Sequence, residues 1–105
     1  MLFRSETSDD GKKLSICVEG KFDFKQRNEF IQLFDDHAEA LSTVHLDLSK
    51  VSYIDSAACG SLIVLHKKAS DSDVEFEPIV INSKVKDVFE ILKLPLLFEF
   101  TLSDD

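Results

Sequence analysis

The sequence predicts an α/β protein in which a mixed, mostly parallel sheet of four to five strands packs against helices. The first observation is periodicity: apolar residues recur at every second position in some segments and at helical spacing in the segments between them. Strands that alternate with helices are typical of a mostly parallel sheet. The second is size: 105 residues, 44% of them hydrophobic, are enough for one compact domain over residues 1–105.

The chain begins with a predicted β-hairpin. The segments LFRSET and KLSICVEG can pair through a turn at Asp10-Gly11, because Asp-Gly favours the tight turn of a hairpin. In the second segment Leu14, Ile16 and Val18 alternate with polar or smaller residues. One face of this strand is therefore expected to be buried.

A helix is expected next. Asp23 can serve as its N-cap, and Gln26 three residues later completes a pattern resembling a capping box. The apolar residues that follow at helical spacing are Phe30, Ile31, Phe34, Ala38 and Leu41.

The central strand and the second helix follow. In VHLDLSKV apolar and polar residues alternate again, and the strand continues through Tyr53 and Ile54 to Asp55. Residues 57–70, AACGSLIVLHKKAS, start with small residues, continue with apolar ones and end with basic ones, which a helix C-terminus favours. This segment is the second predicted helix.

The C-terminal third is predicted to add a strand, a helix and a closing segment. VEFEPIVIN is a core strand in which Pro78 implies an edge, a bulge or a late start, because proline cannot donate to a ladder. Ser83 can cap a third helix, which Pro95 ends, and LLFEFTL forms a last strand or a short closing segment. The apolar face of that helix comprises Val85, Val88, Phe89 and Leu92. The final LSDD is expected to be a short loose end.

Composition narrows the function classes. The formal net charge of −8 disfavours broad attraction to nucleic acid or to an anionic membrane, and a protein partner with a basic rim fits better. Cys17 and Cys59 match no metal-ligand spacing, so both are expected to be reduced, with no metal or cofactor bound. The N-terminus lacks a signal pattern and no apolar run is long enough to span a membrane. A cytoplasmic location without membrane insertion is expected.

Ser56 follows Asp55 at a junction between strand and helix, where sites form in parallel sheets. Asp23 lies at a similar junction. A hydrolase nucleophile is disfavoured, because Ile54 replaces the first glycine of G-x-S-x-G. His37, His45 and His66 show no local pairing with Ser56 and are expected on the surface or in structural roles.

Two interpretations of Ser56 remain open. It can be an N-cap, worth about 1 kcal/mol. It can also be a phosphorylation site, because a phosphate there would lie beside free N–H groups and the positive end of the helix dipole. A phosphate adds about −1.5 to −2 charges next to Asp55, and a partner docked over this rim would then be repelled.

The small residues after Ser56 have two explanations as well. Ala57, Ala58, Cys59 and Gly60 make the first helical turn slim, either for close packing on the sheet or for close approach of a partner. For Cys59, a thiol pKa lowered by the helix N-terminus is the alternative to an inert thiol.

The segment VHLDLSKVSYIDSAACGSLIVLHKKA closely resembles the centre of the STAS domain, the sulfate-transporter and anti-sigma-factor-antagonist domain. There an Asp-Ser step followed by small residues and a leucine leads into a helix. LSICVEGKFDF is similar to the family's second strand and its following turn, and VINSKVKDVFEILKLPLLFEF is similar to its C-terminal part. The resemblance covers nearly the entire chain and implies the STAS fold.

The resemblance implies a regulatory role without enzymatic activity. Ser56 corresponds to the serine that a kinase of the histidine-kinase-like ATPase type phosphorylates and a metal-dependent (PP2C-type) phosphatase dephosphorylates. The unphosphorylated protein is then expected to bind its serine kinase or anti-sigma partner, and so to act on transcription in a bacterial cell. The expected docking residues are Asp23, Asp55, Ser56, Ala57, Ala58 and Gly60.

The resemblance leaves one alternative within the family. The chain can be a constitutive STAS subunit of a lipid-transport ABC complex, whose partner is an ATPase subunit. In that case Ser56 is only a helix cap.

Overall fold

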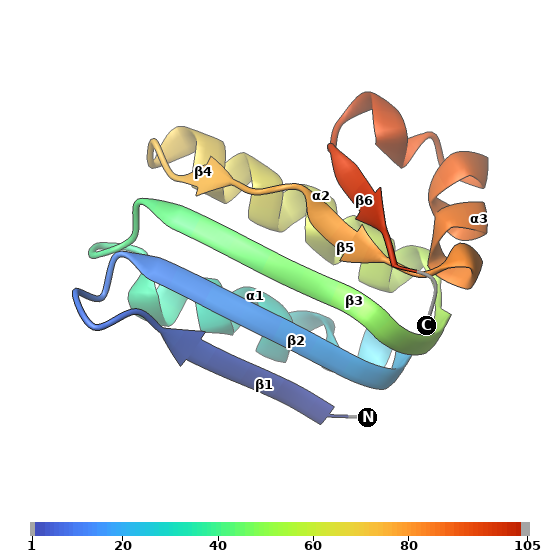
Figure 1. Ribbon diagram of the computed structural model, residues 1–105, viewed down its shortest axis with the longest axis horizontal. Coiled ribbons are helices and arrows are strands. Elements are labelled where there is room, and N and C mark those ends of the chain that lie inside the picture. Colours follow the sequence, from blue (N-terminus) through green and yellow to red (C-terminus); the bar gives the residue numbers. More distant parts are fainter. Residues whose placement is uncertain (1, 104–105) are drawn as a thin grey trace.

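The computed structural model describes residues 2–103 (Figure 1). Strands alternate with helices after the initial hairpin, as the sequence predicts. In chain order the elements are β1 (Leu2–Thr7), β2 (Lys13–Phe22), the short 3-10 helix η1 (Phe24–Gln26), α1 (Arg27–His37), β3 (Thr43–Ile54), α2 (Ser56–Asp71), β4 (Glu75–Phe76), β5 (Ile79–Ile81), α3 (Ser83–Ile91), the 3-10 helix η2 (Leu94–Leu96) and β6 (Phe100–Leu102).

Within residues 2–103, six strands form one sheet, in the order β1-β2-β3-β5-β6 with β4 paired to β3. β1 is antiparallel to β2, and the other pairs are parallel. The predicted mostly parallel sheet is thereby confirmed. It has more strands than the expected four to five because Pro78, which lacks an N–H, separates β4 from β5 along one predicted strand.

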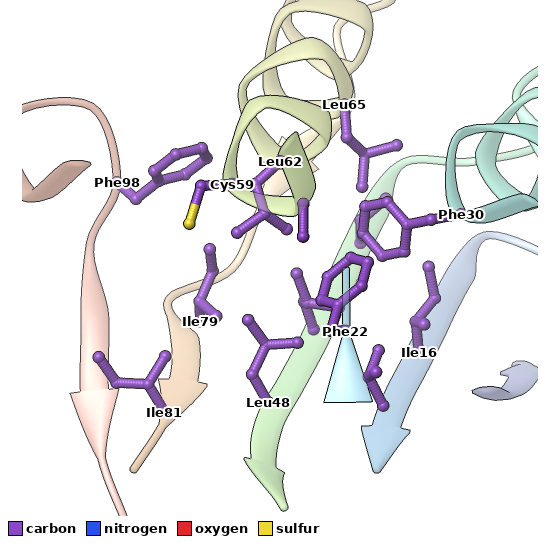
Figure 2. Close-up of a cluster of buried hydrophobic side chains, with 14 of the residues drawn as sticks. Ile16, Phe22, Phe30, Leu48, Cys59, Leu62, Leu65, Ile79, Ile81 and Phe98 are labelled. Carbon is purple, nitrogen blue, oxygen red and sulfur yellow. The ribbon is translucent and has the colours of Figure 1, made fainter. Parts of the chain in front are cut away.

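The hydrophobic core lies between the sheet and the helices. In Figure 1, α1 and α2 lie behind the strands. Figure 2 shows Phe30 of α1 and Leu62 and Leu65 of α2 in one cluster with strand side chains. Alternation along the strands produces this face, and the buried strand residues include Leu14, Ile16, Val18, Val44, Leu46 and Leu48.

Several predicted boundaries shift. The first helix begins as the 3-10 turn η1, and α1 ends at His37, so Leu41 lies beyond it although it is buried. The last strand contains only residues 100–102, because residues 94–96 form η2 around Pro95. Of the predicted loose end, Leu102 belongs to β6, whereas residues 104–105 lie outside the described part of the chain.

The sheet brings two strand ends together. Phe22 at the end of β2 and Ile54 at the end of β3 are register partners in a parallel pair. The backbone N–H of Asp55 donates to the carbonyl of Phe22 at 3.4 Å. Asp23 and Asp55, which follow these partners directly, therefore emerge side by side at the same edge of the sheet.

Candidate functional site

Asp55 connects two helix starts at this edge. As the N-cap of α2, it has extended backbone angles, and its Oδ1 accepts from the N–H of Ala58 at 2.8 Å. Its Oδ2 accepts from the N–H of Phe24, the first residue of η1, at 3.1 Å. One carboxylate thus satisfies a free N–H at each of two helical N-termini, where negative charge is favoured.

Asp23 caps the other helical start. Its Oδ1 accepts from the N–H of Lys25 at 3.0 Å, and its own N–H donates to Oε1 of Gln26 at 2.9 Å. This confirms the predicted capping box. The turn that follows β2 is therefore closed by its own side chains and joined to α2 through Asp55.

Ser56 is the first residue of α2 and its side chain is exposed. The interpretation of Ser56 as the N-cap is wrong, because Asp55 takes that position and accepts the capping hydrogen bond. Within residues 2–103 the Ser56 hydroxyl makes no hydrogen bond. The same one-residue offset occurs at α3, where Asn82 accepts from the N–H of Val85 and Ser83 is the first helical residue.

The small residues after Ser56 divide between the core and the surface. Ala58 and Cys59 are buried, so Ala58 cannot contact a partner with its side chain and leaves the predicted docking set. Ala57 and Gly60 are half-buried, and a Cβ added to Gly60 would meet no atom within 4 Å. Close packing on the sheet explains Ala58 and Cys59, and it does not explain Gly60.

The domain in which Asp55 and Ser56 begin α2 belongs to a known protein family. A family model of the STAS domain matches residues 6–105. The chain belongs to the STAS domain family. The resemblance of its Asp-Ser segment to that family is thereby confirmed.

Known proteins extend this assignment. A STAS-domain containing protein of Pseudomonas aeruginosa (strain UCBPP-PA14) is 27% identical over 94 residues, which cover 90% of this chain and 93% of the relative. The structure of the anti-sigma factor antagonist SpoIIAA in its unphosphorylated form matches with a TM-score of 0.80 at 15% identity, over 99% of this chain and 88% of that chain. A Thermotoga maritima protein described as a candidate anti-sigma factor antagonist gives a TM-score of 0.76 at 19% identity, over 96% and 86%. The likeness to these structures confirms the predicted STAS fold.

Exposed aromatic residues flank Ser56 in this STAS domain, and the sequence reasoning missed them. Phe24 is 64% exposed and Tyr53 is 51% exposed. The ammonium of Lys21 lies 5.6 Å from the centre of the Tyr53 ring. On α2, Ile63 lies seven residues after Ser56, on the same side of the helix, and is also exposed. The exposure of Tyr53 had a signal in the sequence. Tyr53 directly precedes the apolar Ile54, and successive side chains of a strand point to opposite faces of the sheet.

The histidines of the STAS domain make contacts away from Ser56. His37 Nδ1 lies 2.9 Å from the carbonyl oxygen of Leu33. His45 Nδ1 lies 3.1 Å from Oε1 of Glu77, and the His66 ring packs against Phe98 with the ring centres 5.0 Å apart. A Ser-His pair of the kind that activates a nucleophile is therefore not formed at Ser56 in the described chain.

Both cysteines are free thiols. Burial, followed by the charge of Asp55, raises the pKa of the Cys59 thiol to about 11. Burial also raises the pKa of Cys17, and the charges of Asp47 and Glu19 add to this effect. Desolvation thus outweighs the helix N-terminus at Cys59, and the alternative of a lowered thiol pKa is wrong.

Residues 2–103 lack two further features. They contain no group of three or more His, Cys, Asp or Glu side chains that could hold a metal ion. None of their helices has the length and apolar character that crossing a membrane requires.

Proposed function

We propose that this STAS domain is a non-enzymatic regulatory switch of the anti-sigma factor antagonist type, acting in a bacterial cytoplasm. Unphosphorylated, it binds a serine kinase or anti-sigma partner, and phosphorylation of Ser56 releases it. The observation that carries the proposal is the division of roles at the start of α2. Asp55 makes the capping hydrogen bond, so the exposed hydroxyl of Ser56 remains available to a kinase.

The chemistry is a phosphoryl transfer supplied by the partner. The γ-phosphoryl group of ATP moves to Oγ of Ser56, the hydroxyl proton leaves and ADP is released. A metal-dependent phosphatase reverses the change by hydrolysing the phosphoserine to serine and inorganic phosphate. This domain supplies the hydroxyl and the docking surface, and it supplies no catalytic group.

Charge and shape around Ser56 support release by phosphorylation. The modification adds about −1.5 to −2 charges beside Asp55. The surrounding docking surface, which we define as Asp23, Phe24, Tyr53, Asp55, Ser56, Ala57, Gly60 and Ile63, combines exposed apolar side chains with the open space at Gly60. A protein interface needs both apolar contact and close approach. A phosphate at the centre of this surface would have to lose its water without gaining a partner, so partner binding should become strongly unfavourable.

The structural neighbours support the partner class. SpoIIAA is an anti-sigma factor antagonist with an unphosphorylated form, and its fold matches this chain over nearly all its length. The net charge of −8 favours a partner with a basic rim.

Affinity purification from the source cells with phosphosite mapping tests the proposal. We expect the wild-type chain to recover a serine kinase or anti-sigma protein, and a fraction of the chain to carry phosphate on Ser56. The recovered kinase, given ATP and magnesium, should add one phosphate to the wild-type chain and none to the Ser56→Ala variant. Absence of phosphate on Ser56 in that reaction would refute the switch.

A second candidate is a permanent interaction subunit, such as the STAS subunit of a lipid-transport ABC complex. The C-terminal part supports it by exposing five aliphatic side chains: Ile91, Leu92, Leu96, Leu97 and Leu102. Exposed apolar surface on a small domain is typical of a protein contact when it is contiguous. In the same purification this candidate predicts transporter components, equally recovered by wild type and Ser56→Ala, with Ser56 unmodified.

A further inference from the structure

The turn after β2 depends on Asp55 for one of its backbone hydrogen bonds. The N–H groups of Asp23, Lys25 and Gln26 donate to acceptors within the turn itself, namely Oε1 of Gln26, Oδ1 of Asp23 and the carbonyl of Asp23. The N–H of Phe24 instead donates to Oδ2 of Asp55 at 3.1 Å. Asp55 is thus the external side chain that holds the turn at this position.

Phe24 is the residue of the turn whose placement matters for binding. Its side chain is 64% exposed and belongs to the docking surface, which also contains the exposed Tyr53 and Ile63. Because the N–H of Phe24 donates to Asp55, the backbone that carries the ring is held against the start of α2. The residue that holds this backbone is the direct neighbour of Ser56.

We infer that Asp55 is a positioning residue that transmits the phosphorylation state of Ser56 to the turn carrying Phe24. The inference rests on the proposed function, because it takes Ser56 to be the modified residue. It adds a change in shape to the charge repulsion. Phosphorylation then alters the position of Phe24 on the docking surface as well as the charge beside it.

Two physical effects drive this coupling. A phosphate on the first residue of α2 competes with the Asp55 carboxylate for the free N–H groups of the first helical turn, which favour an anion. The two negative groups also repel each other, since they belong to adjacent residues. When the carboxylate turns away, the N–H of Phe24 loses its acceptor and η1 loses its link to α2.

Backbone amide exchange of the isolated chain tests the coupling without any kinase. Phosphoserine is incorporated at position 56 during synthesis of the full chain, and amide exchange is measured by NMR. We expect the Phe24 amide to exchange about tenfold faster or more than in the unmodified chain, as loss of a hydrogen bond to a charged acceptor implies. The Lys25 amide, bonded within the turn, should change little. Phosphoserine at Ser70, exposed near the other end of α2, is the matched control and should leave Phe24 unchanged.

The Asp55→Asn variant separates positioning from capping. Asparagine is as good an N-cap as aspartate, so its oxygen can still accept from Ala58 while its NH₂ group cannot accept from Phe24. We expect faster exchange at Phe24, retained protection at Ala58 and weaker partner binding. Unchanged exchange at Phe24 in the phosphoserine chain would overturn the coupling, and unchanged exchange in Asp55→Asn would show that Asp55 does not hold the turn.

The coupling of Ser56 to Phe24 and the release of the partner by phosphorylation are separate proposals, and different results would refute each. If phosphoserine at 56 abolishes partner binding while the Phe24 amide is unchanged, the coupling is wrong and the switch stands. If the Phe24 amide changes while the partner stays bound, the coupling stands and the proposed function is wrong.

Discussion

At the scale of single residues, Asp55 is the side chain that stabilises the candidate site. Its carboxylate accepts one hydrogen bond from α2 and one from η1, and hydrogen bonds to a charged acceptor are stronger than those between neutral groups. The side chain is half-buried, so water compensates only in part for their loss.

The Asp55→Ala substitution should lower the free energy of unfolding by about 1–3 kcal/mol, because it removes the cap of α2 and the acceptor of Phe24. Asp55→Asn should cost about 1 kcal/mol or less, since it preserves the cap. Urea denaturation followed by circular dichroism measures both. Asp87→Ala, at an exposed position of α3, is the control and should lie within about 0.5 kcal/mol of wild type. Equal stability of the two Asp55 variants would argue against a capping role.

Cys59 provides a pH-dependent prediction. Burial raises the pKa of its thiol from 9.0 to about 11, so above pH 9 the unfolded chain binds fewer protons at this residue than the folded chain. Stability should therefore fall as pH rises from about 9 to about 11, by up to about 3 kcal/mol for a two-unit difference. The free energy of unfolding of wild type and Cys59→Ala, measured across this window, isolates the contribution. A wild-type decline no steeper than that of the variant would contradict the buried thiol.

At the scale of elements, one face of α2 packs on the sheet and another face belongs to the proposed docking surface. Ala58, Cys59, Leu62 and Leu65 face the core, as Figure 2 shows for the last three. Ser56, Gly60 and Ile63 lie at i, i+4 and i+7 on the side that is open or exposed. Gly60 is a costly residue for a helix interior, and since an added Cβ would meet no atom within 4 Å outside its own helix, the fold itself does not require glycine there.

The Gly60→Ala substitution separates the needs of the fold from those of binding. It should raise the free energy of unfolding by about 0.5–1 kcal/mol, because alanine is the better helix former and its methyl group meets open space. It should also weaken partner binding, because that methyl group projects from the docking surface. Ser70→Ala, on exposed α2 surface away from Ser56, controls for helix propensity and should leave binding unchanged. Unaltered binding by Gly60→Ala would remove Gly60 from the docking surface.

At the scale of the whole molecule, the sequence was sufficient to predict the architecture, and it was less informative about the site's surroundings. The Asp10-Gly11 turn identified the hairpin, and periodicity identified the alternating strands and helices and hence the junctions at Asp23 and Asp55, because each depends on local patterning. The division of roles between Asp55 and Ser56 was missed, since Asp and Ser are equally good N-caps and the pattern cannot decide between neighbours. The burial of Ala58 and the exposure of Phe24 depend on how α2 and η1 pack on the sheet, which is tertiary information.

The proposed switch requires the exposed hydroxyl of Ser56 to control binding of a protein partner. It is tested most directly by the dissociation constant of the purified partner for the chain carrying phosphoserine at 56, measured by calorimetry beside wild type and Ser56→Ala. We expect phosphoserine to weaken binding by about a hundredfold or more, because burying an uncompensated charge at the centre of the interface costs several kcal/mol. Ser56→Ala should bind like wild type, and Ser56→Asp should bind more weakly than both. Equal affinity of the phosphoserine chain and Ser56→Ala would contradict the proposed switch.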